Sequence, residues 1–340
     1  MSLPSAVLFC PGRGSYGRAE LGSIARALRL LPADDPLHGV LRLADDTRRG
    51  QGLPTISELD AASSFRPGLH LDGIHAAELI WFATVAHCAL LQTRYDIVAV
   101  AGNSLGWYSA LPVAGAVDVE DGWRLVTTMA RLQRLARGAQ LLTTTVDPES
   151  WLPDAALVRG VEDALAVVSA GGERNFVARS IRLGGHEVLA GTEDGVRALL
   201  ALLPGVRSAE RAFPFQLAGH GPFHTALCEP VATAASAALA DLPIRAPRQH
   251  LIDGRGDQHA PWSADPVALL DYTTTTQVLT TFDFTAAVRT AIREFCPDLL
   301  VCAGPGTSLR APVGHVVLRE GYRGIRSRDR LFDSGLVAID

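Results

Sequence analysis

The feature that most constrains the fold is a short turn between an apolar strand and a helix. Residues 96–101 (DIVAVA) are apolar and partly β-branched, which is typical of a central parallel strand. Gly102-Asn103-Ser104-Leu105-Gly106 follows at once, and residues 105–116 have a helical pattern. In a GxSxG turn the glycines let neighbouring backbones approach while the serine hydroxyl is exposed at the helix N-terminus. We therefore take Ser104 as a candidate nucleophile, with a structural turn serine as the alternative.

The order of the expected elements predicts an α/β fold in two parts. Residues 1–137 and 213–340 alternate strands and helices, which favours a parallel sheet covered on both faces. Residues 138–212 have a different pattern, with strands at 139–146, 175–182, 186–190 and 206–212 and helices at 150–165 and 193–203. This βαββαβ order indicates a ferredoxin-like subdomain inserted into the main body.

Composition excludes several kinds of function. The five cysteines are scattered without a CxxC pair, and no clustered His/Cys/Asp spacing or GxGxxG turn is present, so we expect no metal and no cofactor. The chain has no lysine, which excludes Schiff-base chemistry. A net charge of −5 gives no reason to expect nucleic acid. We see neither a signal peptide nor an apolar run long enough to span a bilayer, and we expect a cytoplasmic protein.

Four motifs resemble those of the malonyl-CoA:acyl carrier protein transacylase family. Its FPGQGSQ resembles residues 10–16 (CPGRGSY), its GHSxGEYSA resembles 102–110 (GNSLGWYSA), its FHxxLM resembles 223–228 (FHTALC), and its late GPG turn resembles 304–306. The motifs occur in the family's order and cover nearly the whole chain. The resemblance implies an α/β-hydrolase-like core with a parallel sheet plus the inserted ferredoxin-like subdomain.

The resemblance also implies roles for individual residues. Ser104 matches the nucleophile and His224 the general base, a choice over His220 that periodicity alone does not make. The backbone N–H groups of Leu105 and Arg13 match the two oxyanion donors. The group that steadies the histidine aligns with Asp283, which would act through either its side chain or its backbone carbonyl.

Several positions differ from the family pattern and point to a changed acyl group. Met129 stands where the family has the arginine that grips the malonyl carboxylate, and a thioether cannot make that bidentate contact. Asn103 replaces a histidine and Trp107 a glutamate. Arg131, two positions after Met129, is expected on another face of the helix. We assign Met129, Trp107, Asn103 and Phe223 to the substrate pocket, with plain core packing as the alternative for Met129 and Trp107.

These observations favour a trans-acting acyltransferase that moves a non-malonyl acyl group between pantetheine thioesters through acyl-Ser104. Specialised biosynthesis, such as that of polyketides, is the expected setting. A hydrolase that clears acyl groups from carriers and a catalytically silent carrier-binding protein are the two alternatives. The expected partners are an acyl carrier protein, acyl-CoA, or both, with neither nucleic acid nor a membrane. Because carriers are acidic, a strip of arginines is a candidate docking surface, or else a solvated tail: Arg319, Arg323, Arg326, Arg328 and Arg330.

Overall fold

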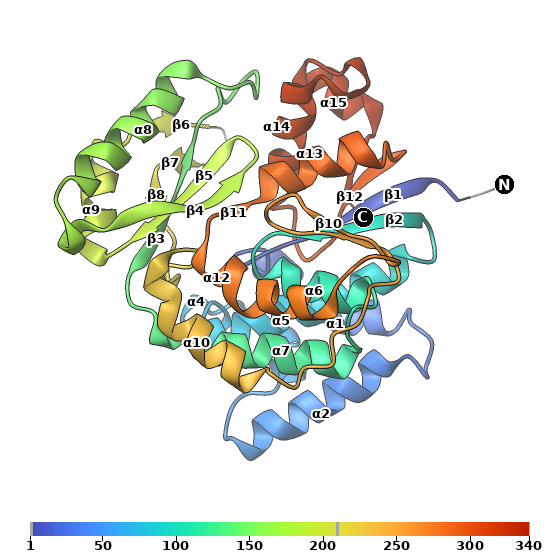
Figure 1. Ribbon diagram of the computed structural model, residues 1–340. Coiled ribbons are helices and arrows are strands. Elements are labelled where there is room, and N and C mark those ends of the chain that lie inside the picture. Colours follow the sequence, from blue (N-terminus) through green and yellow to red (C-terminus); the bar gives the residue numbers. More distant parts are fainter. Residues whose placement is uncertain (1–2, 209–210, 340) are drawn as a thin grey trace.

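The computed structural model describes residues 3–208 and 211–339, and these contain a central sheet of six strands. Figure 1 shows this sheet between two layers of helices. The strand order is β10-β9-β2-β1-β12-β13, and only β10 pairs antiparallel. The strands are β1 (Ser5–Cys10), β2 (Asp96–Gly102), β9 (His250–Ile252), β10 (Gln258–His259), β12 (Leu299–Cys302) and β13 (Val337–Ile339). The centre of β1 is buried on both faces, as its unbroken apolar sequence requires. The predicted α/β fold with a parallel sheet is confirmed.

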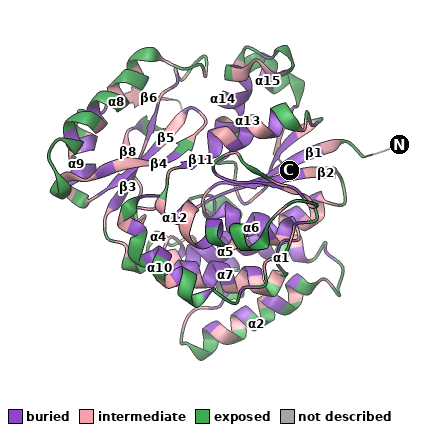
Figure 2. Ribbon diagram, viewed as in Figure 1, coloured by how far each residue is buried: buried purple, intermediate pink, exposed green. Residues whose placement is uncertain are grey.

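Helices cover both faces of this sheet, so its interior is buried (Figures 1 and 2). On one face lie α5 (Gly73–Leu91), α6 (Gly106–Val113) and α7 (Val119–Leu132), and on the other α13 (Phe284–Glu294) and α14 (Arg310–Glu320). The other α-helices of the main body are α1 (Ser23–Leu28), α2 (Pro36–Gly50), α3 (Ile56–Asp60), α4 (Pro67–His70), α10 (Glu229–Ala238), α11 (Pro266–Asp271), α12 (Gln277–Leu279) and α15 (Arg328–Ser334). One turn of π-helix, Tyr272–Thr276, joins α11 to α12.

Helix α5 corrects one sequence expectation. It is long and apolar enough to cross a bilayer, although we expected no such run. However, 78% of its most apolar window is buried within the protein, where it packs against α1, α6 and α7. Its all-round apolarity therefore fits a core helix.

The inserted subdomain has the predicted ferredoxin-like arrangement. Its strands β3 (Ala139–Thr144), β4 (Val177–Leu183), β5 (His186–Gly191) and β8 (Phe215–Gln216) lie in the order β4-β5-β3-β8. Helices α8 (Ala155–Ser169) and α9 (Glu193–Leu202) pack on this sheet and enclose a separate small core. Helix α8 begins later than predicted because Asp154 caps it, accepting from the N–H groups of Ala156 and Leu157.

The fourth strand of the subdomain differs from the prediction. Residues 206–207 and 212–213 form a small two-stranded ribbon, β6 and β7, and β8 takes the fourth place in the sheet. The subdomain sheet thus continues past the boundary at residue 212. Strand β11 (Phe282–Asp283), from the main body, pairs with β4 and links the two parts.

Candidate active site

Ser104 occupies the tight turn that the sequence predicted, between β2 and α6. Its φ of 55° lies in the left-handed region, which a non-glycine residue adopts only when its surroundings enforce it. The glycines on either side permit the close packing that does so. A Cβ at Gly106 would lie 2.1 Å from the Cys10 carbonyl oxygen, and one at Gly102 would lie 2.2 Å from the carbonyl carbon of Gly106.

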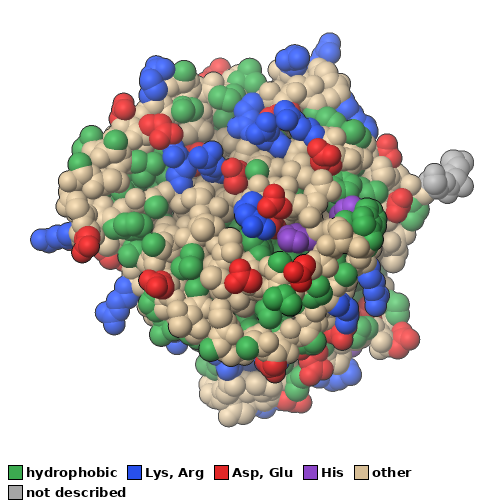
Figure 3. Space-filling model, in the orientation of Figure 1, with side chains coloured by type: hydrophobic (Ala, Val, Ile, Leu, Met, Phe, Trp, Pro, Cys, Tyr) green, Lys and Arg blue, Asp and Glu red, His purple; other side chains and the backbone are tan. Residues whose placement is uncertain are grey.

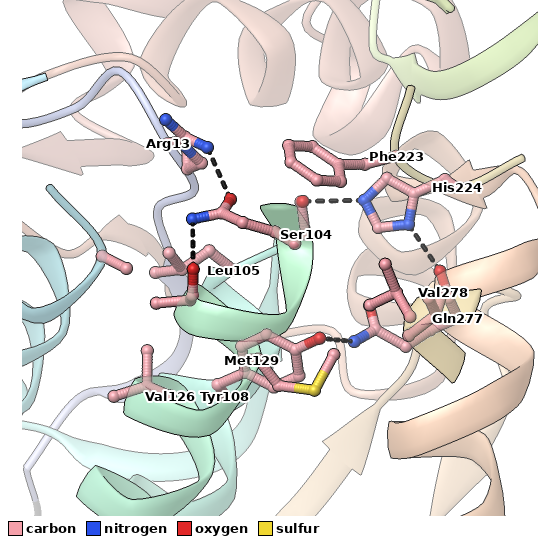
Figure 4. A pocket seen from close by; sticks show the side chains of 14 residues that line it. Arg13, Ser104, Leu105, Tyr108, Val126, Met129, Phe223, His224, Gln277 and Val278 are labelled. Atoms are coloured by element: carbon pink, nitrogen blue, oxygen red, sulfur yellow. Dashed lines mark hydrogen bonds between the residues drawn. The ribbon is translucent and has the colours of Figure 1, made fainter. Parts of the chain in front are cut away.

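His224 meets Ser104 across this turn. The Ser104 hydroxyl lies 2.7 Å from His224 Nε2, although the two residues are 120 positions apart (Figure 4). The imidazole is buried, and His224 also has a positive φ, 59°. His220, the other candidate base, instead lies 3.2 Å from the Gln140 side chain.

The second imidazole nitrogen fixes the tautomer of His224. Nδ1 lies 2.5 Å from the backbone carbonyl oxygen of Gln277, which can only accept, so Nδ1 carries the proton. Nε2 therefore presents its lone pair to the Ser104 hydroxyl. This is the arrangement in which an imidazole can take the serine proton.

The assignment of the histidine's partner to Asp283 is wrong. Asp283 caps α13, where its carboxylate accepts from the Ala286 N–H at 2.8 Å, and Gln277 supplies the carbonyl that binds His224. Gln277 directly follows the π-helix, a turn with one extra residue that often occurs at functional sites. No sequence signal singles it out, because a backbone carbonyl leaves no mark on residue type.

Burial changes the proton affinity of the base. Removal from water lowers the pKa of His224 to about 4, while the hydrogen bond to the Gln277 carbonyl opposes this shift. The imidazole is therefore neutral at neutral pH and free to accept a proton.

This lowered pKa predicts an unusual pH profile. We expect kcat/KM for acylation to stay on its plateau down to about pH 5.5, because His224 loses its lone pair only as the pH falls through its own pKa, about 4. Stopped-flow acylation with a thioester across this range measures it. An acid limb centred near the ordinary histidine value, about 6.5, would contradict the prediction.

Leu105 and Arg13, whose backbone N–H groups are the predicted oxyanion donors, line the same cavity as Ser104. Among residues 3–208 and 211–339, the backbone N–H groups of Leu105 and Arg13 have no protein acceptor. The Gly12 backbone approaches the turn so closely that a Cβ there would lie 2.6 Å from the Asn103 carbonyl oxygen. Unpaired N–H groups at this point are suited to a developing negative charge.

Two cavities meet at Ser104. The first, which we call the inner pocket, has a volume of about 520 Å3 including its mouth and lies between α5, α6, α7 and α12. The second, which we call the groove, has about 2,140 Å3 of space including its open part and runs between the main body and the ferredoxin-like subdomain. Both are lined by Arg13, Ser104 and Phe223, so the Ser104 hydroxyl can be reached from two separate spaces.

The side chain of Arg13, which sequence reasoning missed, closes one side of the inner pocket (Figure 4). Its guanidinium donates to the Gln133 side chain at 2.7 Å and to the Gly219 carbonyl at 3.1 Å, and it lies over the Phe223 ring. Burial lowers the pKa of Arg13 to about 10, so the group remains charged. The guanidinium ties the Arg13 loop, α7 and the segment before His224 together.

The four predicted substrate residues have different locations. Met129 and Phe223 line the inner pocket, and Asn103 lines the groove. Trp107 does not face substrate: it is fully buried, donates to the Thr273 hydroxyl at 3.0 Å and packs edge-on against Tyr272. Its assignment to the pocket is wrong, because it points from α6 toward the π-helix, whereas Tyr108, one turn after Ser104, faces the pocket.

The other arginines considered in the sequence also have different locations. Arg131 points outward to the Gln51 side chain, as expected from its position on α7. Of the predicted docking strip, only Arg328 lines the groove, where it stacks on Trp151. Arg323 instead donates to the Pro297 carbonyl. Figure 3 shows basic side chains gathered over α13 and α14, where Arg289, Arg293 and Arg319 flank Glu320.

Comparison with known proteins agrees with this fold. The malonyl-CoA:acyl carrier protein transacylase of Xanthomonas oryzae pv. oryzae superposes with a TM-score of 0.70 at 22% identity, covering 93% of this chain and 92% of that one. An acyl carrier protein S-malonyltransferase from Vibrio cholerae gives 0.69 at 22% identity, covering 92% and 94%. A malonyl-transacylase solved in complex with its type II polyketide synthase acyl-carrier protein gives 0.70 at 21% identity, covering 92% of each chain.

The curated relatives are much longer proteins. Erythronolide synthase EryA2 of Saccharopolyspora erythraea is 27% identical over 175 residues, which are 51% of this chain and 5% of that protein. The phthioceranic/hydroxyphthioceranic acid synthase of Mycobacterium tuberculosis is 25% identical over 177 residues, 52% of this chain and 8% of that one. The chain therefore spans less than a tenth of the length of these relatives. No family model matches the chain.

The fold and the site together define the class: the chain has an acyl-carrier-protein acyltransferase-like fold, with its serine and histidine in contact between two cavities. Within that class, its fold is the one shared by the malonyl-CoA:acyl carrier protein transacylases, as the four motifs implied.

Proposed function

We propose that this protein is a trans-acting acyltransferase that moves a non-malonyl acyl group between pantetheine thioesters through an acyl-Ser104 intermediate. The observation that carries the proposal is the contact between the Ser104 hydroxyl and His224 Nε2, 2.7 Å, at the junction of two cavities. A serine beside a neutral, buried imidazole with a fixed tautomer is an activated nucleophile.

The proposed reaction has two matched halves. Ser104 Oγ attacks the thioester carbon and gives its proton to His224 Nε2, while the Leu105 and Arg13 N–H groups hold the oxyanion. The C–S bond then breaks and the thiolate leaves with the proton from His224. A second pantetheine thiol loses its proton to His224, attacks the acyl-serine carbon and takes the acyl group, and Ser104 recovers its proton.

The groove is the proposed site of the pantetheine arm, and an acyl carrier protein is the proposed partner. The groove opens from Ser104 toward Arg328 on α15 and Arg211 beside β7. An acidic carrier fits a rim that bears cations. The malonyl-transacylase that resembles this fold was solved with its acyl-carrier protein, which supports the same kind of partner here.

The inner pocket supports the non-malonyl part of the proposal. Met129 faces it with a thioether, and its other walls are mainly apolar, including Ala77, Val126 and Val278. Arg13, the one arginine among its lining residues, already binds Gln133 and Gly219. A free carboxylate placed beside Met129 would lose its hydration without gaining a bidentate partner, which costs several kcal/mol.

Substitution of Met129 tests this interpretation. We expect Met129→Arg to raise the ratio of malonyl to propionyl loading about tenfold or more, because it restores a cation at the floor of the pocket. Competition between the two CoA thioesters, read by intact mass, measures the ratio. Met129→Leu, which adds no charge, should keep the ratio low. Abundant malonyl-enzyme in the wild type would contradict the non-malonyl proposal.

Transfer itself is tested with two carriers of different mass. We expect an acyl group supplied on one holo-acyl carrier protein to appear on the second, and a Ser104→Ala variant to move none. Loss of the acyl group to free acid without transfer would instead indicate a hydrolase. Binding of the carrier without any turnover would indicate a silent carrier-binding protein.

A further inference from the structure

The floor of the inner pocket contains a polar pair that the proposed mechanism does not use. Tyr108 and Gln277 both line the pocket, with exposed fractions of 8% and 2%. The Gln277 side-chain N–H donates to the Tyr108 hydroxyl oxygen at 2.6 Å and to the Thr273 carbonyl at 3.3 Å (Figure 4). Because the Thr273 carbonyl can only accept, this contact fixes which end of the amide is the nitrogen.

Two hydrogen-bonding positions of this pair remain unfilled. Gln277 Oε1 is buried and has no hydrogen-bond partner among the described residues. The Tyr108 hydroxyl accepts from Gln277, and its own proton has no acceptor in the part of the chain that the structure describes. Burial raises the pKa of Tyr108, so that proton stays on the oxygen. A buried polar atom without a partner costs about 1–3 kcal/mol, which a bound ligand can recover.

We propose that the inner pocket selects a short acyl chain carrying a hydroxyl group, which accepts from the Tyr108 O–H and donates to Gln277 Oε1. This inference rests on the proposed acyl transfer and names its substrate class. A hydroxyl is the neutral group that both accepts and donates at one atom. A carboxylate can only accept and would place its charge against Gln277 Oε1, and an alkyl chain would leave both positions unfilled.

The same residue also links recognition to the base. The backbone carbonyl of Gln277 binds His224 Nδ1, and the side chain of Gln277 lines the inner pocket. A chain held by this side chain is therefore bound by the same residue that orients the base. Sites that hydrogen-bond a substrate hydroxyl reject the analogue lacking it far more strongly than apolar pockets reject a missing methylene.

Matched CoA thioesters test the proposal directly. The pairs are glycolyl with acetyl, lactoyl and 3-hydroxypropionyl with propionyl, and 3-hydroxybutyryl with butyryl. We expect at least one hydroxyacyl group to load onto Ser104 about tenfold or more faster than its matched alkanoyl group, as read by intact mass over time. Tyr108→Phe should reduce that ratio toward one, whereas Tyr322→Phe, which removes a tyrosine hydroxyl bound to the Pro297 carbonyl, should keep it.

The outcomes separate this inference from the function on which it rests. If alkanoyl groups load as fast as hydroxyacyl groups in every pair, the hydroxyl proposal is overturned while acyl transfer stands. If no thioester loads at all, the proposed function fails first. The ratio of hydroxyacyl to alkanoyl loading in the wild type decides the question by itself, so a Tyr108→Phe variant that does not fold leaves the test valid. If the variant folds and its ratio equals that of the wild type, the proposal is also overturned.

Discussion

Replacing His224 by alanine is expected to lower the rate of Ser104 acylation about a thousandfold or more while the protein stays folded. The imidazole supplies the only base in contact with the Ser104 hydroxyl among the described residues, and a serine hydroxyl is a weak nucleophile without one. The expected effect falls on the acylation rate constant, because His224 is not among the residues that line the groove proposed to bind the thioester. Single-turnover acylation with a short acyl-CoA measures it.

A control histidine separates loss of the base from general damage. His38, a half-buried residue of α2, contacts the Pro32 carbonyl and lies outside both cavities. His38→Ala should acylate at the wild-type rate. Equal rates for His224→Ala and the wild type would show that the contact seen in the structure is not used in catalysis.

Replacing Gly106 by alanine is expected to destabilise the protein by about 3 kcal/mol or more and to abolish acylation. The added Cβ would lie 2.1 Å from the Cys10 carbonyl oxygen and 2.9 Å from that of Pro11, and both obstacles are backbone atoms that cannot rotate away. Relief requires β1 and the turn to separate. That movement would also displace the Arg13 N–H from the nucleophile.

Urea unfolding measures this effect, with Gly50→Ala as the control. Gly50 ends α2, where an added Cβ meets nothing within 4 Å. Alanine there should be neutral or stabilise the protein by up to about 1 kcal/mol, since alanine favours helix. If Gly106→Ala has the same free energy of unfolding as the control, the turn does not pack against the Cys10 carbonyl as closely as the structure shows.

The parts of the fold that could be predicted from sequence are those with local signals. The buried run of β2 and the Gly102–Gly106 turn specify the strand, the strained serine and the following helix together. The βαββαβ order of the subdomain was likewise readable from alternating apolar segments. Its fourth strand was not, because two-residue strands such as β8 carry too short a pattern to distinguish from the ribbon before it.

The parts of the site that could not be predicted from sequence depend on which way carbonyl groups and side chains point in the folded protein. The π-helix turn brings the Gln277 carbonyl to His224, and alignment on motifs placed that role on Asp283, which caps a helix instead. Trp107 and Tyr108 are neighbours in the chain, yet Trp107 is buried in the core and Tyr108 lines the inner pocket. The sequence predicts a role for the Arg13 backbone N–H as an oxyanion donor. The position of its guanidinium follows only from the packing around it.

The proposed mechanism requires that the Ser104 hydroxyl becomes covalently acylated from a thioester. Mass spectrometry of the intact protein after brief exposure to the hydroxyacyl and alkanoyl CoA panel, followed by peptide mapping, tests it most directly. We expect one added acyl group, on the peptide that contains Ser104, and none on Ser104→Ala. An adduct that persists in Ser104→Ala, or that maps to a cysteine, would contradict it.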